Sequence, residues 1–240
     1  MAKTFKVLSA LLSYPTEDLQ AVAGELRAIV RQEGLIAGAP LARLGQLIGE
    51  IETGDLFDLQ ERYVLLFDRS RSLSLHLFEH LHGEGRDRGQ ALVDLAQFYE
   101  RHGLTVEAKE LPDYLPLYLE FLSTLPLDEA RVLLAEPLHI LAALKQRLRK
   151  RESPYASVFR ALESIANAKP GEDGLKALSG DEDAGPDDLE ALDKAWADEP
   201  VTFGPGAAAA DGGCSGDRVA ARIRAALRPV SSGTRPFPKH

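Results

Sequence analysis

The segment His76-Leu-Phe-Glu-His80 contains residue types that can hold a metal ion and activate water. In the pattern H-x-x-E-H on a helix, the two imidazoles lie one turn apart, where both can bind Zn²⁺. The carboxylate of Glu79 would then lie beside them and could take a proton from a zinc-bound water. Taken in isolation, this segment predicts a zinc metallohydrolase.

The rest of the chain disfavours that interpretation. Such enzymes need a third ligand from a distant helix, and this chain of 240 residues has no second acidic signature matched to the first. A match of five residues also arises by chance. His82 and Glu84 extend the polar cluster, and a solvated loop with ion pairs of about 0.3–0.5 kcal/mol each explains such a cluster equally well.

A second pair of candidate residues is Asp113 and Glu120, which are seven residues apart. On a helix over residues 113–124 they would lie on nearly the same line, two turns apart. Such a stripe of carboxylates could clamp an arginine or lysine of a partner. A glycosidase-like acid and base pair is disfavoured, because a sugar cleft is rich in aromatics and this chain has 7% aromatic residues and one tryptophan.

The elements that must position these residues are helices. Apolar residues recur at helical spacing up to about residue 168, and no sustained run of alternating β-branched residues predicts a sheet. Thr16 is expected to cap the second helix and Gly34 to end it. The apolar stripes of the expected helices run over residues 5–12, 19–30, 41–51 and 56–67. Further helices are expected over residues 86–102 and 113–124, from residue 128 with an interruption at Pro137 and a stripe that continues to residue 148, and from about 154 to 168.

The composition changes after Pro170, where Gly, Pro, Asp, Glu and Ala dominate. We therefore expect a single compact all-α bundle over residues 1–169. Residues 170–240 are expected to form a largely disordered tail with transient helix, acidic at first and then basic.

Charge is unevenly placed along the chain, whose formal net charge is −9. Residues 171–200 carry eleven acidic and two basic residues, whereas residues 201–240 carry two acidic and six basic ones. Nucleic acid requires a concentrated basic face on the folded body, so this balance argues against it. A basic peptide is a reasonable partner on electrostatic grounds.

The expected compartment is the cytoplasm. The single cysteine, Cys214, cannot form an internal disulfide, which favours a reducing environment. The N-terminal residues show neither the apolar stretch of a signal peptide nor a span long enough to cross a bilayer, so an integral membrane protein is not expected.

Five segments together resemble the NarJ family of assembly chaperones, in order and at that family's spacing over roughly residues 5–168. They are residues 63–69 (YVLLFDR), 72–80 (SLSLHLFEH), 82–89 (HGEGRDRG), 110–116 (ELPDYLP) and 153–156 (SPYA). One departure is Gly85, where relatives often carry Ser. The resemblance covers far more of the chain than H-x-x-E-H, and it assigns that motif to a family that is neither zinc-dependent nor proteolytic.

The resemblance implies an all-helical chaperone without catalytic activity or a stably bound cofactor. Its expected partner is the catalytic (alpha) subunit of respiratory nitrate reductase, bound through the N-terminal peptide and other surface of that subunit. The chaperone would assist loading of the molybdenum cofactor into the client before membrane docking. The same fold would also suit a chaperone of another molybdoenzyme.

A peptide site follows from this expectation, with an apolar groove and carboxylates for cationic side chains. The apolar wall is expected from Tyr63, Leu66 and Phe67. Negative charge is expected from Glu79, Glu84, Asp113 and Glu120, with Tyr114 beside them. The histidines His76, His80 and His82 are expected to tune peptide affinity near neutral pH. Affinity that did not change between about pH 5.5 and 8 would contradict the proposed role of the histidines.

Overall fold

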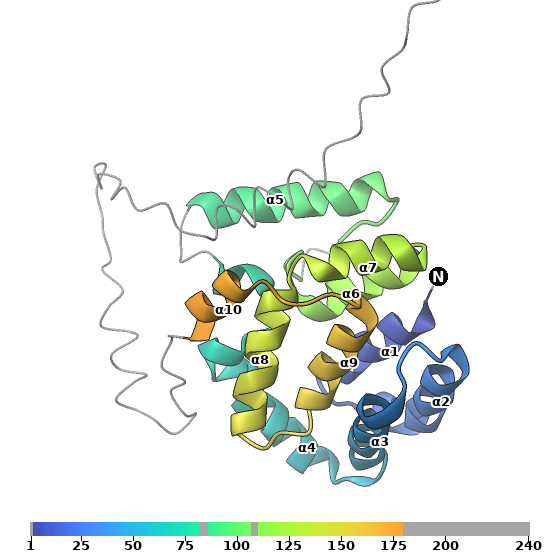
Figure 1. Ribbon diagram of the computed structural model, residues 1–240. Coiled ribbons are helices and arrows are strands. Elements are labelled where there is room, and N and C mark those ends of the chain that lie inside the picture. Colours follow the sequence, from blue (N-terminus) through green and yellow to red (C-terminus); the bar gives the residue numbers. More distant parts are fainter. Residues whose placement is uncertain (1, 82–85, 107–109, 180–240) are drawn as a thin grey trace, which may run out of the picture.

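The computed structural model describes residues 2–81, 86–106 and 110–179, and in these ranges the chain is helical (Figure 1). The described ranges contain no strand, and His76 and Tyr114 form an isolated antiparallel bridge. The all-α prediction is therefore confirmed. The α-helices are α1 (Lys3–Leu11), α2 (Glu17–Glu33), α3 (Gly38–Thr53), α4 (Leu56–Tyr63), α5 (Arg86–Arg101), α6 (Leu115–Thr124), α7 (Leu127–Ala135), α8 (Leu138–Lys150), α9 (Ala156–Ala166) and α10 (Glu172–Ser179).

Local sequence signals set several helix ends. The hydroxyl of Thr16 accepts a hydrogen bond from the backbone N–H of Leu19 at 3.2 Å and caps α2. Gly34 ends that helix with φ of 67°, a left-handed conformation that glycine adopts without steric cost. Both ends agree with the sequence prediction. The side chain of Asp55 caps α4 by accepting from the backbone N–H of Phe57 and of Asp58.

Helix α1 packs against α2 and α6. Its side chains Phe5, Leu8 and Leu11 are completely buried. Burial of each such side chain is worth about 1.5–3 kcal/mol relative to exposure, so α1 is a major source of core stability. Helices α8 and α9 pack against each other, and α3 joins α9 to α2 (Figure 1).

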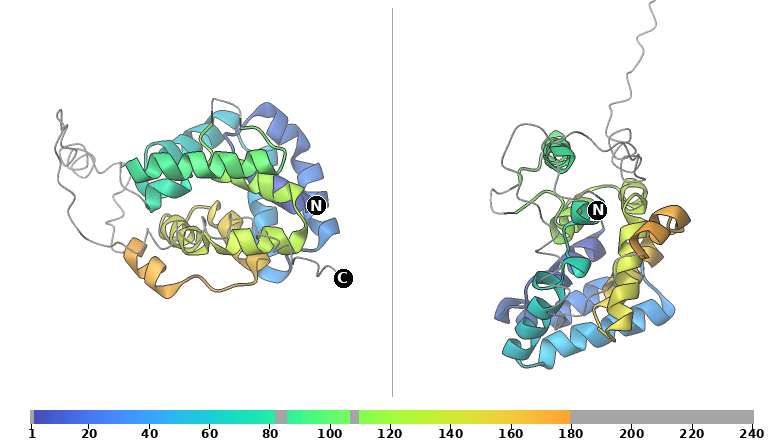
Figure 2. Two further views of the ribbon diagram at one scale, coloured as in Figure 1. Left: turned by 90° about the horizontal axis from the view of Figure 1, so that it is seen from above. Right: turned by 90° about the vertical axis from the view of Figure 1, so that its left-hand side faces the viewer.

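Helix α5 crosses one end of the body and is seen end-on at its edge in the right-hand view of Figure 2. Large side chains anchor it, since the rings of Phe98 and Tyr99 lie 5.4 and 4.8 Å from the ring of Phe121 on α6. The hydroxyl of Tyr99 also donates to the carbonyl of Pro112 at 2.8 Å. These contacts fix the loop before α6, which carries Asp113.

The packed body continues to Ser179, past the boundary that the sequence predicted at residue 169. Helix α10 packs on α8, and its Leu178 is buried. The buried guanidinium of Arg147 donates to the carbonyl of Leu178 at 2.6 Å and to that of Ser72 at 2.7 Å. The composition change near Pro170 is therefore not the end of the packed body. The rest of the predicted tail, residues 180–240, lies outside the described residues.

The position of α10 depends on the small size of Gly174. A Cβ atom at this position would lie 2.8 Å from Cδ2 and 3.0 Å from Cγ of His139, which is buried in α8. We predict that Gly174→Ala accelerates hydrogen exchange of the α10 amides by roughly tenfold, because overpacking of this kind costs about 1–3 kcal/mol. The matched change Gly45→Ala in α3 meets open space and should slow exchange there. Unchanged exchange in α10 would show that the ring of His139 moves aside at no cost.

Candidate functional site

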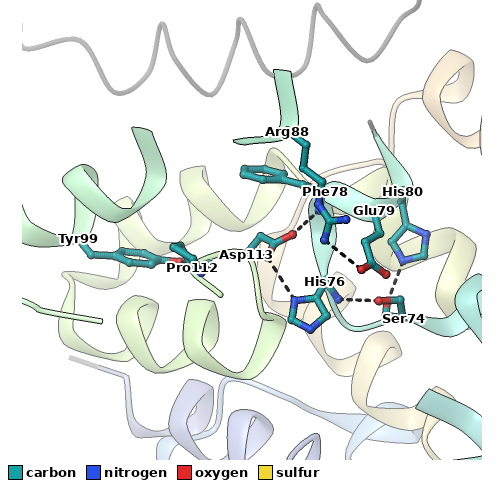
Figure 3. A network of polar contacts seen from close by, with 9 residues as sticks. All are labelled: Ser74, His76, Phe78, Glu79, His80, Arg88, Tyr99, Pro112 and Asp113. Atoms are coloured by element: carbon teal, nitrogen blue, oxygen red, sulfur yellow. Dashed lines mark hydrogen bonds and ion pairs between the residues drawn. The ribbon is translucent and has the colours of Figure 1, made fainter. Parts of the chain in front are cut away.

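Two chain segments that together carry five of the predicted site residues, His76, Glu79, His80, Asp113 and Tyr114, meet beside α6 (Figure 3). The N–H of Leu77 donates to the carbonyl of Asp113 at 3.0 Å, and the N–H of Leu115 donates to the carbonyl of Leu75 at 2.8 Å. His76 and Tyr114 form the bridge between these two hydrogen bonds, and their rings are 5.3 Å apart. We call residues 74–80 and 112–115 the loop junction.

The carboxylate of Asp113 holds the loop junction together. It is completely buried, and it accepts a hydrogen bond from the backbone N–H of Phe78 at 3.0 Å. Its other oxygen lies 3.3 Å from Nδ1 of His76 (Figure 3). A buried carboxylate is stable only when its oxygens have such partners. Asp113 therefore orders the loop from inside and does not face a ligand.

The predicted stripe of Asp113 and Glu120 on one helix is wrong. Helix α6 begins at Leu115, with Pro116 in its first turn, so Asp113 precedes the helix. Proline is favoured in the first turn because it lacks the N–H that would be unpaired there. Glu120 lies on α6 with a half-exposed side chain, 3.3 Å from the ammonium of Lys6. The two carboxylates thus have separate partners and environments.

The H-x-x-E-H segment does not have the geometry of a zinc site. It is not an α-helix but a single 3₁₀ turn, Leu77–His80, preceded by His76. Nε2 of His80 donates to the carbonyl of Ser74 at 2.8 Å, and Glu79 pairs with Arg88 at 3.0 Å (Figure 3). Nδ1 of His76 contacts Asp113. Among the described residues, no group of three His, Cys, Asp or Glu side chains is placed to hold a metal ion. The metallohydrolase interpretation is therefore not supported.

The hydrogen bond that Nδ1 of His76 donates to Asp113 raises the pKa of His76, and burial of the ring opposes this effect. The charge of Asp113 and the nearby Glu79 raise the pKa further, whereas Arg88 lowers it. The side chain of His76 is 29% exposed, so water reaches one edge of the ring.

This raised pKa makes stability depend on pH. The contribution of His76 is fully present below its unfolded pKa near 6.5 and is lost as pH rises through the higher folded pKa. We predict that His76→Gln lowers the free energy of unfolding more at about pH 6 than at about pH 9, measured by urea titration. Burial lowers the pKa of His139. His139→Gln should therefore lower the free energy of unfolding less at about pH 6 than at about pH 9. Equal losses at both pH values for His76→Gln would refute the pairing with Asp113.

The predicted apolar wall is not exposed. Tyr63, Leu66 and Phe67 are all buried, with 4%, 7% and 6% of their surfaces exposed. The rings of Tyr63 and Phe67 pack on the ring of Tyr155 at 6.3 and 5.1 Å. α4 continues as a π-helical turn, Val64–Asp68, which places these side chains in the core. These three side chains therefore belong to the hydrophobic core and do not form the wall of an exposed groove.

Tyr63 connects the core to the loop junction. Its hydroxyl donates to the carbonyl of Leu12 at 2.9 Å and lies 3.2 Å from the hydroxyl of Tyr114. Burial raises the pKa of both hydroxyls, so both remain neutral. Tyr114 is half-buried, so part of its side chain is in contact with solvent.

Sequence reasoning did not single out three exposed residues, Tyr14, Asp68 and Glu110. Glu110 and Asp68 are exposed, and their negative charges add to the effect of burial in raising the pKa of the Tyr114 hydroxyl. Tyr14 is 45% exposed, and the centre of its ring is 5.6 Å from that of Tyr63 in an edge-on contact. These residues come from three distant parts of the chain. Their spacing in the sequence therefore gave no signal.

His82 and Glu84, also predicted for the site, lie outside the described residues.

The chain matches the family described as nitrate reductase delta subunit over residues 32–161. It is 42% identical to the nitrate reductase molybdenum cofactor assembly chaperone NarJ of Escherichia coli K12, over 91% of this chain and 90% of that protein. The chain belongs to the nitrate reductase delta subunit family. The resemblance of the five sequence segments is thereby confirmed.

Two further similarities are weaker. A Bacillus subtilis protein described as a probable chaperone of the same kind is 34% identical, over 66% of this chain and 85% of that protein. A crystal structure from Archaeoglobus fulgidus, described as a redox enzyme maturation protein, superposes with a TM-score of 0.52 at 24% identity. It covers 70% of this chain and 94% of that one, and it shows a shared fold. In the described part of the chain, no helix has the length and apolar character needed to cross a bilayer.

Proposed function

We propose that this chain is an assembly chaperone of respiratory nitrate reductase, acting in the cytoplasm without chemistry of its own. It binds the catalytic subunit and assists insertion of the molybdenum cofactor before that subunit docks at the membrane, and it retains no cofactor stably itself. The observation that carries the proposal is 42% identity to a named nitrate reductase chaperone over nine-tenths of both chains. The names of the relatives favour nitrate reductase over another molybdoenzyme as the client.

The N-terminal peptide of the catalytic subunit is the proposed ligand, and it binds beside the loop junction. We call the binding face the Tyr114 surface and define it by Tyr14, Asp68, His76, Glu110 and Tyr114. Asp68 and Glu110 are exposed carboxylates near a half-buried aromatic ring. Carboxylates of this kind hold arginine or lysine, and aromatic faces hold the apolar positions of an amphipathic segment.

The buried part of the junction gives this surface its shape. Asp113 fixes the backbone of residues 76–78, and the pair of Glu79 with Arg88 joins the same turn to α5. A face held in one conformation before binding loses less entropy when the peptide docks. Glu79 and His80 thus support the proposed site through their partners in the protein, and Glu120 stands apart from it.

The test is complementation in cells whose own chaperone gene has been deleted. The double variant Asp68→Asn, Glu110→Gln should restore less nitrate reductase activity than the wild type, with less molybdenum in the purified catalytic subunit. The matched variant Glu120→Gln, which removes an exposed carboxylate elsewhere, should restore both fully. A wild-type chain that restores neither activity nor molybdenum content would contradict the chaperone function. A double variant that restores both fully would contradict only the placement of the binding face.

A further inference from the structure

A basic cleft lies away from the loop junction, between α3, α8 and the start of α9. Its volume is about 330 Å³. It is lined by the exposed guanidinium groups of Arg43, Arg149 and Arg160, together with Gln46 and the first residues of α9. None of these three guanidinium groups forms an ion pair or a hydrogen bond within the described part of the chain. Unpaired arginines gathered in one concavity repel each other, and an anion would relieve this repulsion.

The other charged groups of the cleft are mostly neutralised. Lys145 pairs with Glu163, and Glu50 pairs with Arg62 at 3.1 Å. Among the described lining residues, the charges that remain are the three guanidinium groups and the carboxylate of Glu152. The cleft therefore has an excess of two positive charges. A phosphate monoester carries a charge of about −1.5 to −2 at pH 7, which matches this excess.

The turn between α8 and α9 brings the lining residues together. Glu152 has φ of 52°, a left-handed conformation that costs a non-glycine residue about 1 kcal/mol or more. The N–H of Ser153 donates back to the carbonyl of Leu148 at 2.9 Å and closes the turn. As a result, Arg149 at the end of α8 and Arg160 in α9 line the same cleft.

We propose that this cleft binds the phosphate group of a small phosphorylated molecule. Guanidinium groups present paired N–H donors that match phosphate oxygens, and several of them can converge on one phosphate. An acidic peptide is a poorer match, because its charges are spread along an extended chain at about 3.3 Å per residue and need a long groove. The volume is sufficient for a phosphate with a small attached group. This inference goes beyond the chaperone function and does not depend on it.

The test is calorimetric titration of the full chain with pyrophosphate at constant ionic strength. Saturable binding with one site is expected. The double variant Arg149→Gln, Arg160→Gln should weaken it at least about tenfold, since each charge-assisted hydrogen bond is worth about 1.5–3 kcal/mol. Arg149→Lys, Arg160→Lys keeps the charge but loses the paired donors, and it should give intermediate affinity. All of these side chains are exposed, and circular dichroism will confirm that the variants fold.

The control is Arg101→Gln, an exposed arginine in the last turn of α5 at the opposite end of the molecule (Figure 1). Its affinity for pyrophosphate should stay within about twofold of the wild type. Three results would overturn the proposal: no saturable binding, equal weakening by Arg101→Gln, or tighter binding of a hexaglutamate peptide than of pyrophosphate.

Discussion

Replacement of Asp113 with alanine is expected to lower the free energy of unfolding by about 3–4 kcal/mol. The carboxylate is completely buried, and its loss leaves the N–H of Phe78 and the ring of His76 without their partner. An unpaired buried donor bears the full cost of its lost hydration. Urea denaturation at pH 6.5 measures this change, which should shift the midpoint by roughly 1–2 M.

Glu120→Ala is the matched control for Asp113→Ala. Its half-exposed carboxylate makes an ion pair with an exposed lysine, and such pairs are worth about 0–1 kcal/mol. The change should therefore shift the midpoint little. Similar losses for Asp113→Ala and Glu120→Ala would contradict the structural role of Asp113, as would a fully stable Asp113→Ala protein.

Tyr63→Ala is the second large change, with an expected loss of about 3–5 kcal/mol. The ring is 96% buried against Tyr14, Phe67 and Tyr155, so truncation leaves a cavity in the core. Loss of the hydroxyl also removes the hydrogen bond that Tyr63 donates to the carbonyl of Leu12. Thermal and urea unfolding should both show the loss.

Tyr63→Phe separates packing from hydrogen bonding. This variant keeps the ring contacts and loses the bonds to Leu12 and Tyr114, so the expected loss is about 1 kcal/mol. If Tyr63 lined an exposed groove, as the sequence predicted, both variants would be almost as stable as the wild type. Their stabilities therefore decide between a core role and a surface role.

The helical fold was predictable because its signals are local. Thr16, Gly34 and Asp55 act through backbone groups within four residues of themselves. Apolar periodicity placed the helices for the same reason. Helix α10 was missed because its packing depends on Gly174 fitting against His139 and on Arg147 reaching Leu178, which are contacts across 31 or more residues.

The candidate site was predicted only in part. Five of the residues proposed for the site, His76, Glu79, His80, Asp113 and Tyr114, belong to the loop junction. Their roles were not predictable from type and spacing, because the same carboxylate attracts a ligand when exposed and orders a loop when buried. The partners of the Asp113 carboxylate, His76 and the N–H of Phe78, lie 37 and 35 residues away in the sequence. Burial is a property of the whole fold, and no local pattern reports it.

This division between buried and exposed carboxylates explains how one surface can be both rigid and charged. Asp113 and its partners are inside, where their removal affects stability. Asp68 and Glu110 are outside, where their removal should affect binding and leave stability nearly unchanged. The two groups of variants should therefore give opposite results in unfolding and binding assays.

Calorimetric titration with the N-terminal peptide of the nitrate reductase catalytic subunit tests the central claim most directly. The wild type should bind one peptide with an affinity in roughly the micromolar to nanomolar range. Asp68→Asn, Glu110→Gln should weaken binding by about three- to tenfold, and Glu120→Gln should not change it. No detectable heat with the wild-type chain would contradict peptide binding, and equal affinities for all variants would contradict its location at the Tyr114 surface.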